Sequence, residues 1–236
     1  MPRAQPLLLL PPSEGKAPGG DGPGWPAGGT ADRALDRHRR LVLRGAKAAG
    51  ATPKRAGTVP AIERYTGVLY KELDWPSMPA VARRRGAEQV RIVSGLWGLV
   101  APEDPLPPYK LKMSASLPEL GKLSTWWRPR LAPVVASLAR GRVVWDLLPI
   151  EHTAAMDWRT ADPALRVTVR FVDQDDKTVS HWNKLLKGAL VRWVLAEQPT
   201  GPDDLRRFEH PLRYRYDPAA TQMGDGTAAI VLRAAS

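Results

Sequence analysis

The residues best suited to chemistry form a short loop near the amino terminus. Ser13, Glu14, Gly15 and Lys16 supply a hydroxyl, a carboxylate, a flexible backbone and an ammonium directly after the apolar run at 7–10. Because α/β folds place ligand contacts where a buried strand ends, this loop predicts contact with an anionic partner. The glycine spacing of a Walker phosphate loop is absent. A strand-to-loop turn with solvated charges remains the alternative.

Two further loops carry hydroxyl groups beside a glycine, at Tyr65-Thr66-Gly67 and Ser94-Gly95. Glycine lets backbone donors face a ligand, and the hydroxyls add donors and acceptors. We expect these loops to converge with the first on one pocket for a phosphate- or carboxylate-bearing molecule. Capping of nearby helices explains either loop when it is taken alone. The remaining pocket candidates are Tyr109, Lys110 and Asp146.

Positive charge suggests a second kind of binding surface. The formal net charge is +11, which attracts polyanions such as double-stranded DNA. An arginine-rich composition explains the same charge without any partner. We expect phosphate contacts from two basic helices. The candidates are Arg37, Arg40 and Arg44 on the first helix, and Lys184, Lys187 and Arg192 on a later one.

The composition also excludes several classes of protein. The chain has no cysteine, so it forms no disulfide, thiolate nucleophile or iron–sulfur cluster. Glu151, His152 and Asp157 could form a hard-ion site, although ordinary histidines explain these residues better, and no serine lies in a Gly-x-Ser-x-Gly elbow. The apolar runs are too short for a signal peptide or a membrane-spanning helix. We therefore expect a cytoplasmic, monomeric protein with no metal, cofactor or membrane partner.

Hydrophobic patterning predicts one compact mixed α/β domain over residues 1–236. Apolar runs or alternation predict strands at 7–10, 90–93, 109–113, 142–148, 166–172 and 228–232. Helical periodicity predicts a helix capped by Thr30 and helices at 61–64, 80–86, 126–139 and 180–197. Glycine and proline dominate 17–30, which predicts an ordered loop or a lid beside Ser13. The elements alternate irregularly, so we expect a mixed sheet flanked by helices.

Several short motifs occur in an order that resembles one known family. They are Pro11-Pro12-Ser13-Glu14-Gly15-Lys16, Arg64-Tyr65-Thr66-Gly67, Val93-Ser94-Gly95-Leu96-Trp97-Gly98, Pro108-Tyr109-Lys110-Leu111, Trp126-Trp127, Asp146-Leu147 and Lys187-Gly188. Together they are similar to the YaaA family of peroxide stress proteins. The opening Pro-Ser-Glu-Gly-Lys resembles a divergent, actinobacterial-like branch. The resemblance spans nearly the whole chain.

This resemblance implies a cytoplasmic protein that limits iron-driven oxidative damage under hydrogen peroxide and lowers free iron. It also implies a mixed α/β fold with a helix–hairpin–helix element that binds duplex DNA without marked sequence preference. Gly95-Leu96-Trp97-Gly98 is the stretch that resembles such a hairpin. Our first hypothesis is a non-enzymatic DNA-binding stress protein. The second is an enzyme in which Lys16 neutralises an anionic small molecule and Glu14 acts as an acid or base.

Overall fold

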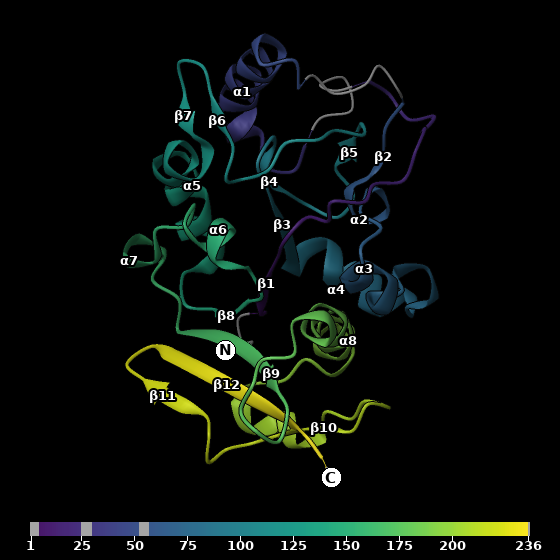
Figure 1. Ribbon diagram of the computed structural model, residues 1–236, viewed down its shortest axis with the longest axis vertical. Helices are drawn as coiled ribbons and strands as arrows, with labels where there is room; N and C mark the ends of the chain where they lie inside the picture. The colour runs from purple at the N-terminus through teal and green to yellow at the C-terminus, as the bar shows by residue number, and fades with distance from the viewer. Residues whose placement is uncertain (1–4, 25–29, 52–56, 236) are drawn as a thin grey trace.

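Eight strands form one mixed sheet through the middle of the molecule (Figure 1). The computed structural model describes residues 5–24, 30–51 and 57–235. The strands are β1 (Leu7–Leu10), β3 (Val90–Ser94), β4 (Gly98–Val100), β8 (Val143–Asp146), β9 (Leu165–Val172), β10 (Tyr214–Tyr216), β11 (Gln222–Gly224) and β12 (Thr227–Ala234). They are ordered β10-β12-β9-β8-β1-β3-β4, with β11 paired to β12. The expectation of a mixed α/β fold is confirmed.

Helices cover both faces of this sheet. They are α1 (Asp36–Ala48), α2 (Ala61–Arg64), α3 (Val68–Leu73), α4 (Ala80–Gln89), α5 (Leu123–Ala139), α6 (Ile150–Thr153), α7 (Trp158–Ala161) and α8 (Ser180–Glu197), with 3-10 turns η1 (Arg33–Leu35), η2 (Trp75–Ser77) and η3 (Pro202–Arg207). In Figure 1, α3, α4 and α8 lie on one side of the column of strands, and α5, α6 and α7 lie on the other. Within the described ranges, no helix has the length and apolarity needed to cross a membrane.

Two short strand pairs lie outside the main sheet. Strand β2 (Val59–Pro60) pairs with β5 (Pro105–Leu106), and β6 (Ser116–Leu117) pairs with β7 (Gly121–Lys122). The first pair ties the segment before α2 to the proline-rich connection that follows β4. These pairs therefore fix long connections against the main sheet.

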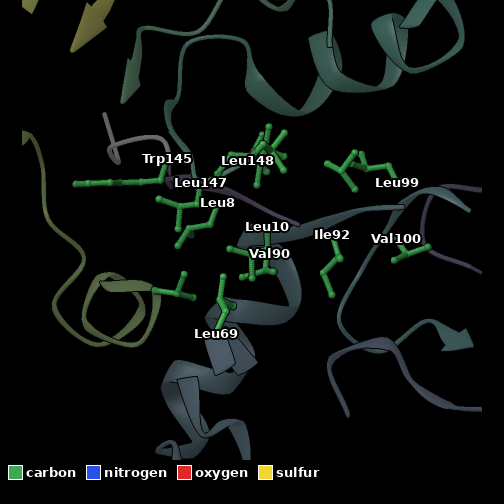
Figure 2. Close-up of a cluster of buried hydrophobic side chains, with 14 of the residues drawn as sticks. Leu8, Leu10, Leu69, Val90, Ile92, Leu99, Val100, Trp145, Leu147 and Leu148 are labelled. Atoms are coloured by element: carbon green, nitrogen blue, oxygen red, sulfur yellow. The ribbon is translucent and has the colours of Figure 1, made fainter. Parts of the chain in front are cut away.

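Strand β1 lies at the centre of the sheet and of the core. Its four leucines have no exposed surface, because β3 and β8 pair with it on either side and helices cover both faces. Strands buried in this way have continuous apolar sequences, which is why the sequence predicts β1 correctly. Figure 2 shows Leu8 and Leu10 beside Val90 and Ile92 of β3, on the side where Leu69 of α3 lies.

The order of strands around β1 determines where a ligand site is expected. The chain passes from β1 to β3 on one side of β1 and reaches β8 on the other side. Strands β3, β1, β8 and β9 are parallel, so their carboxyl ends lie at one edge. In open α/β sheets, ligands bind beyond the carboxyl ends of strands where the winding direction changes. The loop after β1 occupies this position.

Segment 109–113 is not a strand, contrary to expectation. Tyr109 and Met113 are buried and the two lysines between them are exposed, so the alternation seen in the sequence is present. The segment nevertheless pairs with no strand in the described part of the chain. It packs on Gly95, where an added Cβ would lie 2.7 Å from the backbone carbonyl carbon of Lys112. Packing on a neighbouring turn therefore produces the alternation.

Three helix boundaries also differ from expectation. Helix α4 continues past Gly86 to Gln89; this glycine makes room for Trp75, since an added Cβ would be 2.5 Å from the indole ring. Thr30 does not cap α1; its hydroxyl donates to Asp36 at 3.0 Å, and a 3-10 turn precedes the helix. Helix α5 begins at Leu123, three residues earlier than predicted.

The stretch Gly95-Leu96-Trp97-Gly98 is the turn between β3 and β4, which pair antiparallel. A helix–hairpin–helix needs a helix on each side of its hairpin, so the expected position of that element is wrong. Gly98 has a φ of 71°, and an added Cβ would lie 2.7 Å from the ring of Trp127. The glycine is therefore required by the turn and by its buried neighbour.

The described part of the glycine- and proline-rich segment is held by backbone contacts; residues 25–29 of the predicted loop lie outside the described residues. Gly22 exchanges backbone hydrogen bonds with Thr58 at 3.0 and 3.4 Å. The buried guanidinium of Arg64 donates to the carbonyls of Ala17, Gly19 and Gly57. Residues 17–22 are thus tied to the segment that leads into α2.

Replacing Gly188 by alanine is expected to destabilise the fold by about 1–3 kcal/mol, because extra atoms in a packed contact force it apart. In α8, an added Cβ at Gly188 would lie 2.2 Å from the carbonyl oxygen of Leu69 in α3. Chemical denaturation measures the change. Gly201→Ala is the control, since its Cβ would meet open space at a φ of −174°. A Gly188→Ala protein as stable as this control would contradict the tight contact.

Candidate functional site

A cleft of about 640 Å³ opens at the carboxyl edge of the central strands. It is lined by the loop at 12–16 that follows β1, by the segment 109–115, and by Glu151 and His152 of α6. Strand β8 leads into α6 and strand β1 into the loop, so neighbouring parallel strands deliver two of the walls. The structure places Ser13, Glu14, Lys16, Tyr109 and Lys110 among the lining residues.

The first two predicted loops touch beside this cleft, although Tyr65, Thr66 and Gly67 are not among its lining residues. The backbone N–H of Thr66 donates to the Ser13 hydroxyl at 3.0 Å, and Lys16 and Tyr65 form an antiparallel bridge. Gly67 permits this approach, because an added Cβ there would lie 2.7 Å from the Cβ of Ser13. The Ser13 hydroxyl is therefore held by the second loop.

The third predicted loop joins them through a chain of buried hydroxyl groups. The Tyr109 hydroxyl lies 2.6 Å from that of Tyr65 and 2.7 Å from that of Ser94. Ser94 accepts the N–H groups of Leu96 and Trp97, so its own proton is available to Tyr109. Burial raises the pKa of Tyr65 well above its usual value and that of Tyr109 to about 12. These phenols are therefore neutral and hold the wall in place.

Lys16 extends its ammonium over this aromatic wall. Its Nζ lies 4.4 Å from the ring centroid of Tyr109 and 5.6 Å from that of Tyr65, and it donates to the Ser13 carbonyl at 2.9 Å. Burial is the main reason that the pKa of Lys16 is lowered to about 8; the charge of Glu14 raises this pKa, and the charges of Arg64 and Lys110 lower it. The amine is thus charged at neutral pH, yet it has lost much of its water.

The rim of the cleft carries exposed charges. Glu14 pairs with Lys112 at 2.7 Å, and both side chains are largely exposed. The hydrogen bond and charge of Lys112 lower the pKa of Glu14, so Glu14 is a carboxylate at neutral pH. Lys110 is exposed on the same segment. The loop after β1 and the segment 109–115 are therefore linked by a solvated ion pair.

His152 lines the same cleft, although the sequence favoured an ordinary histidine over a hard-ion site with Glu151 and Asp157. Its side chain is 5% exposed, and burial lowers the pKa of its imidazole. Its Nδ1 is buried, has no hydrogen-bond partner in the part of the chain that the structure describes, and lies 3.6 Å from Glu151 Oε1. The one sequence signal was its place shortly after a strand that ends in a carboxylate. Among the described residues, no group of three or more His, Asp or Glu could hold a metal ion.

Asp146 does not line the cleft, although it ends β8 as expected. Its Oδ2 accepts two hydrogen bonds from Arg166 of β9, at 2.6 and 3.0 Å, and its Oδ1 accepts the N–H of Leu148 at 3.1 Å. Burial raises the pKa of Asp146, and the charge of Arg166 opposes that effect. This carboxylate therefore joins β8 to β9 behind the cleft.

The six basic candidates do not form one surface. Arg37, Arg40 and Arg44 are exposed on α1, which packs near β6, whereas α8 packs on α3 and α4. On α8, Lys187 is half-buried and donates to the Leu147 carbonyl, and Arg192 donates to the carbonyls of Leu73 and Asp74. Lys184 is exposed and acts electrostatically on Glu14. The expected stripe along α8 is therefore interrupted by internal contacts.

Comparison with known proteins gives consistent similarities. A family model described as peroxide stress protein YaaA matches residues 33–220. A UPF0246 protein of Streptomyces coelicolor is 36% identical over 245 residues, which cover 92% of this chain and 94% of that protein. UPF0246 proteins of Cereibacter sphaeroides and Salinispora tropica are 33% and 32% identical, covering 70% and 73% of this chain and 66% of each relative. The expected resemblance is confirmed.

Two substitutions are expected to move the pKa of Lys16 in opposite directions. Glu14→Gln removes a charge that raises this pKa and should lower it, whereas Lys110→Gln removes a repulsive charge and should raise it. The Cε–Hε resonance of Lys16, assigned with a Lys16→Arg variant, reports the titration by NMR. The wild type should titrate near pH 8. Shifts in the same direction for both variants would contradict this arrangement.

Proposed function

We propose that this chain, which belongs to the peroxide stress protein YaaA family, limits iron-driven damage under hydrogen peroxide through a small molecule bound in its cleft. The ligand carries a phosphate or carboxylate group. The observation that carries this proposal is the position of Lys16, whose ammonium is held in the cleft over Tyr109 and beside the Ser13 loop.

The electrostatics of Lys16 favour an anion in the cleft. Taking a cation out of water is costly unless an opposite charge or hydrogen bonds compensate it. In the described residues, no carboxylate lies within ion-pair distance of Lys16, because Glu14 pairs with Lys112. A carbonyl and two ring faces supply the present contacts. An anionic ligand would supply the missing charge and restore the stabilisation lost with water.

The arrangement supports binding more directly than it supports a reaction. Ser13 accepts from Thr66 and donates to the Gly15 carbonyl, so its hydroxyl is engaged in the loop. Glu14 is exposed at the rim, where Lys112 keeps it ionised. These contacts make the loop a binding element. The role of Glu14 as an acid or base is therefore the weaker part of the enzyme hypothesis.

Lys16→Ala is expected to abolish the protection that this protein gives against hydrogen peroxide, because it removes the cation that receives the ligand. The test is peroxide survival and free intracellular iron in a strain lacking the gene, complemented with the wild type or Lys16→Ala. Lys122→Ala, which removes an exposed lysine on β7, is the matched control and should complement fully. Full complementation by Lys16→Ala would refute a role for the cleft, and normal survival of the deletion strain would refute the stress role.

A specific observation also favours a second candidate function, non-specific binding of duplex DNA. The exposed residues Arg33, Arg37, Arg40, Arg44 and Lys47 recur at alternating intervals of four and three. This spacing places side chains on one face of a helix. Such a row suits contacts with phosphates, which position a protein on DNA without reading its sequence. The hypothesis of DNA binding therefore rests on the exposed basic residues of α1 and not on those of α8.

Replacing Arg37, Arg40 and Arg44 together by glutamine is expected to weaken duplex binding and flatten its salt dependence. If each arginine meets one phosphate, the slope of log affinity against log salt should fall by about 0.9 per residue, roughly 2.7 in all. Mobility-shift titrations on random duplex at several salt concentrations measure this slope. A control with Arg83, Arg84 and Lys122 replaced removes the same charge from other exposed positions. Equal losses in both variants would indicate that α1 is not the contact surface.

A further inference from the structure

His152 differs from the other groups that line the cleft, because it is buried, neutral and able to gain a proton. Only 5% of its surface is exposed, and its backbone is fixed at the start of α6 by a hydrogen bond from its N–H to the Pro149 carbonyl at 2.9 Å. Among the described residues its Nδ1 has no hydrogen-bond partner, and Glu151 Oε1 lies 3.6 Å away. A buried polar atom without a partner costs stability, so it calls for an explanation other than packing.

The charged residues that line the cleft with His152, or lie beside its helix, come from four parts of the chain. They are Glu151 on its own helix, Glu14 and Lys16 on the loop after β1, Lys110 and Lys112 on the segment 109–115, and Arg128 of α5, which donates to the Ala154 carbonyl beside α6. Glu151 favours the protonated imidazole, whereas burial opposes it and has the larger effect. The empty cleft therefore holds a neutral imidazole.

We propose that the cleft takes the phosphate group of a phosphomonoester as a dianion, and that His152 binds this group as an imidazolium after taking up a proton. The inference rests on the proposed function, because it uses the same cleft and the same Lys16. A dianion needs two positive charges within the site, and Lys16 supplies one of them. His152 supplies the second from the buried part of the lining, because Lys110 and Lys112 are exposed to solvent and Lys112 pairs with Glu14 at the rim.

This arrangement predicts a definite coupling between protons and ligand. If protonation of His152 strengthens ligand binding by some factor, ligand binding must raise the pKa of His152 by the logarithm of the same factor. A tenfold gain in affinity therefore raises the pKa by about one unit. Lys16 acts in a separate pH range, because its pKa is about 8. The contributions of the two residues can therefore be separated along one pH profile.

The test uses sulfate, a tetrahedral dianion whose charge is constant over the whole pH range. Sulfate affinity of the wild type, measured by calorimetry or thermal shift, should fall at least about tenfold between pH 5.5 and 7.5, and fall again above pH 8. In His152→Gln the first decrease should disappear, with less than about a twofold change, and the second should remain. Lys16→Ala should lose binding at every pH. Acetate, a monoanion, should bind the wild type at least about tenfold more weakly than sulfate at pH 6.

The outcomes separate the two proposals. Sulfate binding that is absent in the wild type, or unchanged in Lys16→Ala, would overturn the anion cleft and this inference with it. Binding that needs Lys16 but has the same pH profile in His152→Gln would overturn only the role of His152. Acetate that binds as well as sulfate would overturn the dianion. NMR titration of the wild-type imidazole gives an independent measurement, and an unchanged His152 pKa at saturating sulfate would also refute the proposal.

Discussion

The structure depends first on the burial of one short strand on both of its faces. The four leucines of β1 have no exposed surface and are held between the parallel strands β3 and β8. Backbone pairing sets the register of β1 on both sides, where Leu9 lies opposite Arg91 of β3 and Asp146 of β8. Its carboxyl end is therefore fixed against the ends of both neighbours. The Ser13 loop, the Ser94 turn and α6 take their positions from that edge.

A second constraint is that several basic side chains form hydrogen bonds inside the molecule and do not face solvent. The fully buried Arg39 donates to the carbonyls of Trp97, Asp32 and Leu99, and Arg64 holds the segment at 17–19 in the same way. These guanidinium groups satisfy backbone carbonyls in connecting segments and on the edge strand β4. The formal charge of +11 therefore counts cations that are not available to a partner. Charge alone was a poor guide to a surface, and the exposed row on α1 is a better one.

How well the sequence predicted each part followed from the range of the interactions involved. The bounds of β1 and α8 were predicted correctly, because local apolar patterns determine them. The sequence predicted that three loops converge on one pocket. The structure brings these loops into contact, but of the three only the Ser13 loop lines the cleft, and the hydroxyl chain through Tyr109 depends on segments far apart in the sequence. Segment 109–113 was predicted wrongly, since alternation does not show whether a partner strand exists. The ion pair between Asp146 and Arg166 and the position of His152 in the cleft could not be predicted, because no local sequence pattern indicates either of them.

The two ends of the cleft contribute differently to recognition. In the buried part of the cleft, the Lys16 ammonium donates to the Ser13 carbonyl and lies over the ring of Tyr109. Buried hydrogen bonds between hydroxyl groups hold that ring in place. Moving Lys16 would therefore destabilise the fold. At the rim, the Glu14–Lys112 pair is solvated and exchanges readily with water or an incoming charge. A ligand can therefore displace the Glu14–Lys112 ion pair at low cost, whereas its anionic group must fit the buried surroundings of Lys16. Selectivity for the ligand thus lies with the buried groups, and access to them lies with the exposed pair.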